Sequence, residues 1–259
     1  MIASERFSRI VQMTNDRGFI STKELANTLN VTETTIRRDC EELEQQGLLI
    51  RVHGGAKSIK QNEILSNKDE KKMSERIDVH HIEKDIVCQR AVSFIKDGDC
   101  VFLDGGTSIV PMLKYIKNKK IKIVTHSMLI ANLFDEDSNA ELFLIGGKYI
   151  PEYNMSVGPI TLSDLEKFNF DYAFLSCAGI DLERQLIYTA EMDTMAVKQK
   201  AMNLSVKKYM LIDSSKIFVK GFCSFISSND FDAIICNQDE CINEEDLPNN
   251  FILVNRDVE

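Results

Sequence analysis

The chain has 259 residues, 44% of them hydrophobic and 27% charged, which is the composition of an ordinary globular protein with room for a small domain and a larger one. No stretch approaches eighteen apolar residues and the N-terminus carries no apolar signal segment, which excludes the membrane-spanning and secreted classes and predicts a cytoplasmic protein. The net charge is −9, but residues 1–60 hold nine Lys/Arg against eight Asp/Glu, whereas residues 61–259 hold 22 against 32. The acidic charge therefore belongs to the second part of the chain.

Two short helices are predicted at the start of the chain. Residues 5–15 carry apolar side chains at helical spacing, and Gly18 ends this segment. Residues 19–20 are extended, and Ser21 or Thr22 then caps a second helix. The expected inner face of that helix consists of Leu25, Ala26 and Leu29.

A third helix follows after a turn of two or three residues, with Thr32 as its N-cap. One face of this helix consists of residues spaced i, i+3, i+4 and i+7, namely Thr34, Arg37, Arg38 and Glu41. The opposite, inward face consists of Ile36, Cys40 and Leu43. A helix that buries one side and offers Thr and Arg from its first turns fits the DNA major groove, where arginine can bond bidentately to guanine.

A small hairpin with a basic tip is predicted after Gly47, because residues 48–52 alternate toward His53-Gly54-Gly55. An Arg-Arg pair taken alone is explained as well by a solvated charged face. The three helices, the short turn and the hairpin together favour a winged helix-turn-helix that binds DNA. The predicted DNA-binding residues are Ser21, Thr22, Thr32, Thr34, Thr35, Arg37, Arg38, Arg51 and His53.

These motifs resemble a known family. Arg6-x-x-x-Ile10, the run from Thr32 to Asp39 and His53-Gly54-Gly55-Ala56 are similar to the DNA-binding head of the DeoR family of bacterial transcription regulators. Two positions depart from its pattern: Cys40 replaces a larger aliphatic residue, which loosens the inward packing, and Thr32 replaces a common serine. The nearly neutral head implies modest nonspecific DNA affinity, so dimerisation would help it to bind tightly.

The remainder of the chain divides into a polar linker, residues 58–73, and a body, residues 74–259; the head is residues 1–57. Short apolar runs in the body predict six strands: 101–103, 121–124, 142–145, 172–176, 210–212 and 233–236. Helical spacing appears between them, over 82–95, 109–116, 128–134, 160–168 and 192–206. This alternation predicts an α/β body with a largely parallel sheet covered on both faces.

Ligands of such sheets bind beyond the carboxyl ends of the strands, where this chain places small polar residues. The first predicted strand leads into Asp104-Gly105-Gly106-Thr107-Ser108 and then a helix, which is typical of a phosphate cradle, although a plain tight turn is an equal alternative. Later strands end in Thr125-His126-Ser127, in Gly146-Gly147 and in Asp213-Ser214-Ser215-Lys216. Four such loops on one edge favour a binding site.

The body also resembles the DeoR family, whose C-terminal domain is similar in fold to ribose-5-phosphate isomerase and binds phosphorylated sugars. The family's Asp-Ser-Gly-Thr-Thr loop appears as Asp104–Ser108, with a hydroxyl lost at Gly105, and its Thr-Asn-Ser as Thr125–Ser127. His126 could bond a phosphate or be a plain surface or turn histidine. Further matches to the family are Glu191, Lys198 and Lys216, although Glu191 and Lys198 could also form a surface pair seven residues apart.

The expected effector-binding residues are therefore Asp104, Gly105, Gly106, Thr107, Ser108, Thr125, His126, Ser127, Gly146, Gly147, Glu191, Lys198, Asp213 and Lys216. The seven cysteines are odd in number and lack a C-x-x-C pair, so free buried thiols are expected rather than disulfides or a metal site, with Cys236 and Cys241 only weak metal candidates. No cofactor is expected.

Two functions remain open for the body. A sugar-phosphate isomerase would need a carboxylate base and an electrophile around one carbon, which Asp104, Glu191, Asp213, Lys198 and Lys216 could supply, but nothing in the sequence places them so. A DNA-binding head favours sensing over catalysis, and the polar, glycine-rich loops disfavour a scaffold protein. The expected function is a repressor of a sugar-use operon that binds double-stranded operator DNA as a homodimer or higher homo-oligomer and responds to a phosphorylated sugar.

Overall fold

The fold is taken from a computed structural model, which describes residues 2–52, 54–58, 73–182, 184–217, 219–239, 242, 244 and 247–255. His53, Cys241 and most of the predicted linker lie outside the described residues. No helix among the described residues has the length and apolarity needed to cross a membrane.

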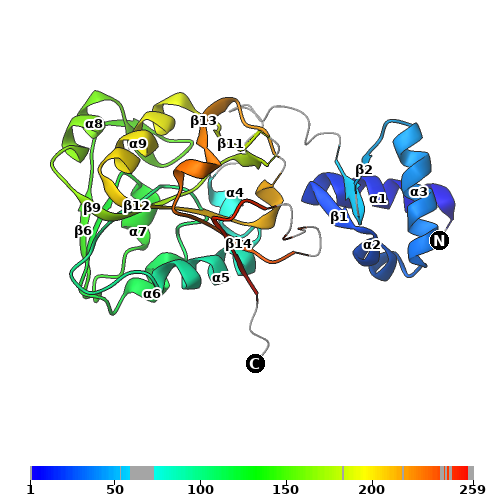
Figure 1. Ribbon diagram of the computed structural model, residues 1–259, viewed down its shortest axis with the longest axis horizontal. Helices are drawn as coiled ribbons and strands as arrows, with labels where there is room; N and C mark the ends of the chain where they lie inside the picture. Colours follow the sequence, from blue (N-terminus) through cyan, green and yellow to red (C-terminus); the bar gives the residue numbers. More distant parts are fainter. Residues whose placement is uncertain are drawn as a thin grey trace.

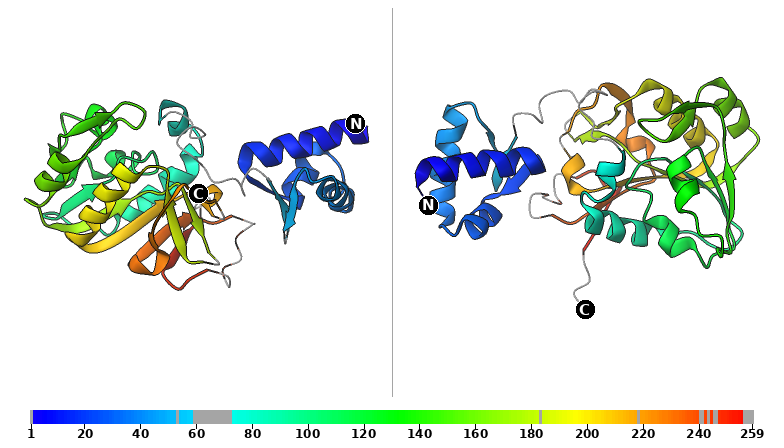
Figure 2. Two further views of the ribbon diagram at one scale, coloured as in Figure 1. Left: turned by 90° about the horizontal axis from the view of Figure 1, so that it is seen from above. Right: turned by 180° about the vertical axis from the view of Figure 1, so that it is seen from behind.

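The head is a three-helix unit with a small antiparallel sheet (Figure 2). Its helices are α1 (Ala3–Arg17), α2 (Thr22–Leu29) and α3 (Glu33–Gln45). Its strands are β1 (Phe19–Ser21), β2 (Ile50–Val52) and β3 (Gly55–Lys57), in the order β1-β3-β2. The predicted winged helix-turn-helix is therefore confirmed, with β2 and β3 as the hairpin.

Caps and a small apolar core fix the helices of the head. The Ser21 hydroxyl accepts a hydrogen bond from Glu24 N at the start of α2, and Thr32 does the same for Thr35 N at the start of α3. Asn30 ends α2 in the left-handed conformation, with φ 52°. The predicted inward residues of α2 and α3 are all buried in one cluster: Leu25, Ala26, Leu29, Ile36, Cys40 and Leu43.

The body is built on a seven-stranded sheet in which every neighbouring pair is parallel, in the order β15-β14-β12-β9-β4-β5-β6. Its strands are β4 (Cys100–Leu103), β5 (Lys122–Thr125), β6 (Glu141–Leu144), β9 (Phe170–Leu175), β12 (Ser205–Ile212), β14 (Ala233–Asn237) and β15 (Phe251–Val254). All six predicted strands are present, and the predicted α/β fold is confirmed.

Helices cover the sheet on both sides (Figure 1). They are α4 (Met73–Ile77), α5 (His81–Val92), α6 (Met112–Ile116), α7 (Met128–Leu133), α8 (Pro159–Leu165) and α9 (Met192–Asn203). Alternate residues of each strand enter two separate cores: Val101 and Leu103 of β4 pack with α5, whereas Phe102 packs with α8 and α9 residues. The sheet therefore separates two apolar layers.

Short antiparallel strands surround the main sheet and were not predicted. They are β7 (Lys148–Ile150) paired with β8 (Met155–Val157), and β11 (Leu186–Thr189) between β10 (Gly179–Asp181) and β13 (Cys223–Ser227). The helix predicted over 109–116 begins only at Met112, after a series of turns. Pro111 has no N–H, so a regular helix through this segment would lose the bond to Thr107 O.

Candidate functional site

The predicted DNA-reading surface is exposed on the first turns of α3. Thr32, Thr34, Arg37 and Arg38 are all exposed. Arg37 forms an ion pair with Glu33 one turn earlier, at 3.2 Å, whereas no ion pair of Arg38 is found within the described part of the chain. The hydroxyls of Thr32 and Thr35 lie 2.9 Å apart. This surface offers two guanidinium groups and several hydroxyls to a ligand.

The other predicted DNA-binding residues make contacts inside the head. The Ser21 hydroxyl caps α2, and the Thr22 hydroxyl donates to Gly54 O at 3.0 Å, which ties α2 to the hairpin. Arg51 lies between the carboxylates of Glu41 and Glu44, at 3.7 and 4.0 Å. Ser21 and Thr22 are buried, so their hydroxyls hold the hairpin and helix in place.

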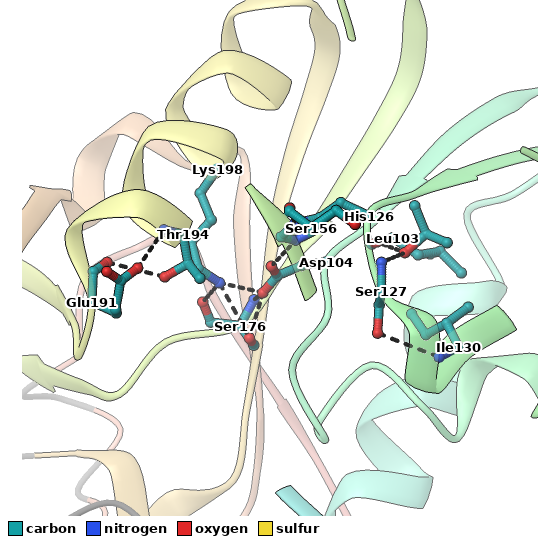
Figure 3. Close-up of polar contacts among 11 residues, drawn as sticks. Leu103, Asp104, His126, Ser127, Ile130, Ser156, Ser176, Glu191, Thr194 and Lys198 are labelled. Atoms are coloured by element: carbon teal, nitrogen blue, oxygen red, sulfur yellow. Dashed lines mark hydrogen bonds and ion pairs between the residues drawn. The ribbon is translucent and has the colours of Figure 1, made fainter. Parts of the chain in front are cut away.

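Asp104, directly after β4, is the centre of a buried polar cluster (Figure 3). Its Oδ2 accepts hydrogen bonds from Lys198 Nζ, from the Ser176 hydroxyl and, at 3.0 Å, from Ser176 N. Burial raises the pKa of the Asp104 carboxyl, but Lys198 and His126 outweigh that effect and hold the pKa well below its usual range. Asp104 is therefore a fixed carboxylate, paired with Lys198 of α9.

His126 lies beside the second carboxylate oxygen of Asp104. Its Nδ1 lies 2.7 Å from Ser156 O, its Nε2 lies 3.5 Å from Asp104 Oδ1, and its side chain is fully buried. This excludes the surface-histidine alternative. Thr125 and Ser127 are also fully buried: the Thr125 hydroxyl donates to Leu103 O at 2.7 Å, and the Ser127 hydroxyl caps α7. All three side chains are engaged within the fold.

The backbone amides of the predicted phosphate cradle, residues 105–108, donate to no acceptor within the described part of the chain. All four residues are buried, and Gly106 lines the pocket beside the Asp104 cluster. Lys84 of α5, which was not predicted, reaches this loop: its Nζ donates to Thr107 Oγ1 at 3.1 Å and to Arg76 O at 2.6 Å. An ammonium has three N–H donors, and no third acceptor for Lys84 is found among the described residues. The helix expected to begin directly after this loop begins only at Met112. The positive charge beside the loop comes instead from Lys84.

Charges around Lys84 make this end of the site cationic. Burial lowers the pKa of Lys84 to about 8; Asp213 opposes that shift, and Lys216 and Arg76 add to it. Asp213 is buried and caps the short helix η2 (Ser214–Lys216). Burial raises the pKa of the Asp213 carboxyl, but Lys216 and His80 outweigh it and the pKa is lowered. Two lysines and one carboxylate thus surround the Thr107 side of the loop.

A pocket opens between the Asp104 cluster and α9. Its lining residues include Arg76, Gly106, Met155, Ser176, Glu191 and Lys198. Glu191 precedes α9, and its carboxylate accepts from Thr194 N at 2.8 Å, so Glu191 and Lys198 both face the pocket and do not pair with each other. Gly146 and Gly147 lie two strands away from β4 and contact Thr161 of α8 instead.

Sequence reasoning missed Lys84, Arg76, Ser176 and Met155. A signal existed for Lys84, because it shares the buried face of α5 with Val87, Cys88 and Ala91, and a lysine at an inward position is unusual. Met155 gave no such signal, because its three-residue strand leaves no periodic pattern, and Ser176 was only the last residue of the strand predicted over 172–176. Among the described residues, no group of three or more His, Cys, Asp or Glu is arranged to hold a metal ion.

Comparison with known proteins identifies the family. Residues 6–62 match the family model of the DeoR-like helix-turn-helix domain, and residues 79–238 match that of the DeoR C terminal sensor domain. The chain belongs to the DeoR family. The resemblance seen in the sequence is confirmed, and with it the predicted function class, a DNA-binding transcription regulator with a C-terminal sensor domain.

Curated relatives match the DeoR-family chain over nearly its full length. The lactose phosphotransferase system repressor of Streptococcus mutans is 31% identical over 247 residues, covering 93% of this chain and 95% of the relative. That of Staphylococcus epidermidis is 29% identical over 245 residues, covering 94% and 95%. Among solved structures, ribose 5-phosphate isomerase from Methanocaldococcus jannaschii matches with 14% identity and a TM-score of 0.40, over 53% of this chain and 55% of that one.

Proposed function

We propose that this DeoR-family repressor reads its operator with the first turns of α3 and binds a phosphorylated sugar in the pocket beside Asp104. The cradle of free amides at residues 105–108, with Lys84 beside it, carries the effector half of this proposal. Free amides and an ammonium are the groups that hold a phosphate. The relatives named lactose phosphotransferase system repressor support a regulated operon for sugar use.

The proposed sugar end of the site lies against Asp104, Ser176 and Glu191. Asp104 and Lys198 neutralise each other below the pocket, while the carboxylate of Glu191 faces it from the start of α9. The second oxygen of Glu191 is placed to accept a hydrogen bond from a sugar hydroxyl. Lys216 and Asp213 flank the phosphate end. Thr125, His126 and Ser127 hold the floor of the site, and Gly146-Gly147 shapes the neighbouring turn.

The same geometry supports a sensor rather than an isomerase. A general base must reach the proton that it removes. The Asp104 carboxylate is fully buried, held by Lys198 and both Ser176 donors, and Asp213 is likewise buried as a helix cap. Incubation of the full chain with sugar phosphates should give no aldose–ketose conversion above that of a Lys198→Met variant; measurable conversion by the natural chain alone would contradict this.

The proposed domains are the head (residues 1–57), the linker (58–73) and the effector domain (74–259). The near-neutral head supports a homodimer or higher homo-oligomer, because one head offers little charge for phosphate contacts. A cytoplasmic location fits a repressor that must meet both operator DNA and a phosphorylated sugar.

The DNA-reading proposal is tested by gel shift with the operator. Arg38→Ala and Arg37→Ala should each weaken binding by about 1–3 kcal/mol, if each arginine contacts a base or phosphate. Arg38 lacks an ion pair within the described residues, so its loss should cost at least as much as that of Arg37. Arg9→Ala on α1 is the control and should bind normally. Unchanged binding by both α3 variants would show that this helix does not read the operator.

The effector proposal is tested by thermal shift with sugar phosphates and their unphosphorylated sugars. Only phosphorylated compounds should stabilise the natural chain, and Lys84→Met should abolish that stabilisation. A Cβ on Gly106 would lie 1.9 Å from the Ser176 hydroxyl, so Gly106→Val should also abolish it by displacing Ser176. A hit that both variants retain would locate the effector elsewhere.

A further inference from the structure

Gly105 and Met155 compete for the same space. A Cβ built on Gly105 would lie 2.4 Å from Met155 Cε, 2.7 Å from Cγ and 2.8 Å from Sδ, far inside van der Waals contact. The φ angle of Gly105 is outside the left-handed region, so its backbone would accept any residue. A side chain at position 105 would therefore require Met155 to move.

The backbone of Met155 is held in place by the loop after β5. Met155 opens β8 and forms a bridge with Ser127, and the adjacent bonds are Met128 N to Asn154 O and Ser156 N to His126 O, both 2.8 Å. Its side chain is buried, with 4% exposed. The thioether therefore lies beside Gly105, at the start of the cradle loop.

The pocket lining mixes apolar and polar groups. The apolar ones include Met73, Met155, Ala178 and Ala190, and the polar ones include Ser176, Thr189, Glu191, Thr194 and Lys198. A sugar likewise presents both hydroxyls and C–H bonds, which point in different directions. Met155 stands where a hydroxyl at position 105 would otherwise offer a hydrogen bond.

We infer that Met155 is a specificity-determining residue of the effector pocket: it selects sugar phosphates that turn a C–H group or a deoxygenated carbon, rather than a hydroxyl, toward the Gly105 side of the cradle. This inference rests on the proposed effector function. A sugar hydroxyl directed at the thioether would lose its hydrogen bond to water and gain no hydrogen bond from the protein, which weakens effector binding by about tenfold. The phosphate contacts at Lys84 and residues 105–108 are the same for both kinds of sugar.

Calorimetric titration of the full chain measures this selectivity. The probes are glucose 6-phosphate, galactose 6-phosphate and ribose 5-phosphate, the 2-deoxy counterparts of the first and last, and inorganic phosphate. Within at least one pair of sugar phosphates that differ at a single carbon, either by a missing hydroxyl or by its configuration, the natural chain should bind one compound about tenfold more tightly than the other. If no sugar phosphate binds, the proposed function fails and this inference fails with it.

Two variants of nearly equal volume isolate the role of Met155. Met155→Leu keeps the site apolar and should keep the selectivity ratio, whereas Met155→Gln offers an amide to a hydroxyl and should reduce that ratio about tenfold. Affinity for inorganic phosphate should not change in either variant. A Met155→Gln variant that retains the natural ratio would overturn the inference while leaving the proposed function intact.

A double-mutant cycle tests the competition for space. Gly105→Ser should push Met155 into the pocket and weaken effector binding about tenfold, and Met155→Ala in the same chain should restore binding with a preference for the hydroxylated sugar. If the two substitutions have merely additive effects on effector affinity, Met155 is not the side chain displaced, and the inference fails.

Discussion

Lys84 is a residue of the proposed effector site whose charge changes at a pH close to neutrality. Burial lowers its pKa to about 8, below the ordinary lysine value of 10.5. Because the folded-state pKa is the lower one, the unfolded chain binds more protons between about pH 8 and 10.5, and stability contributed by this group rises with pH across that window. Effector binding should have the opposite dependence, since a phosphate requires the charged ammonium.

Effector affinity should therefore fall about tenfold between pH 7 and pH 9, where a phosphate monoester is already a dianion and only the ammonium titrates. Titration calorimetry at both pH values measures the change. Lys84→Met should bind weakly at both, and Lys207→Met, which removes a lysine paired with Asp232, should behave like the natural chain. The same fall in Lys84→Met would assign the titration to another group.

Residues of the site were predictable where strand topology alone brings them together. Asp104 and Asp213 follow parallel strands, and Lys198 comes from a helix over the same edge, so a common site could be expected. His126 was predicted either to bond a phosphate or to be a plain surface or turn histidine, and the structure buries it under β8. Three-residue strands such as β8 leave almost no periodic signal, so the burial of His126 could not be seen in the sequence.

At the scale of elements, an ion pair joins α1 to α3, the proposed DNA-reading helix. Arg6 bonds Asp39 with two nitrogens, Nε to Oδ2 at 2.5 Å and Nη2 to Oδ1 at 3.0 Å, and the two side chains are only 13% and 8% exposed. The Asp39 carboxylate follows directly after Arg37 and Arg38. The Arg6–Asp39 pair therefore fixes the orientation of α3, and with it the position of Arg37 and Arg38, relative to α1.

Arg6→Ala should lower the free energy of unfolding by about 1–3 kcal/mol, because Asp39 is left partly buried without its partner. Urea unfolding of the head transition measures this, and operator affinity should fall with it. Arg6→Lys should recover only part of both losses, since lysine cannot form the paired bonds. Arg9→Ala is the matched control: its pair with Glu5 is 3.6 Å long and half exposed, so stability should change by less than about 0.5 kcal/mol.

The central strands were predictable and the peripheral ones were not, for one physical reason. Strands buried on both faces contain continuous apolar runs, as at residues 233–236 of β14, which no solvent-facing alternation obscures. The strand β13 pairs with β11 from a distant part of the chain, as in Thr189 with Cys223, whereas β10 and β11 form a local hairpin of very short strands. Non-local pairing and strands of three or four residues both leave little periodic pattern in the local sequence.

At the scale of the whole molecule, the charge distribution argues for assembly. The acidic second part of the chain repels DNA, and the head contributes almost no net charge. We expect light scattering to show at least a dimer at micromolar concentration, and operator binding to weaken cooperatively on dilution below the dissociation constant of the dimer. A monomer that retains full operator affinity would contradict this expectation.

Effector and operator should affect each other's binding by the same factor. A ligand shifts the DNA-binding equilibrium only through its different affinity for the two states, and linkage makes that coupling reciprocal, typically 5–150-fold, or about 1–3 kcal/mol. The operator Kd is measured with and without saturating effector, and the effector Kd with and without operator DNA. The two ratios should agree, whether the effector releases or strengthens DNA binding.

Lys84→Met should retain operator affinity yet show no response to the effector at concentrations that saturate the natural chain. Arg38→Ala should do the reverse, binding effector normally with weak operator affinity, which separates the reading surface from the sensing pocket. Ratios near one in the natural chain would mean that the pocket and the reading helix are not coupled.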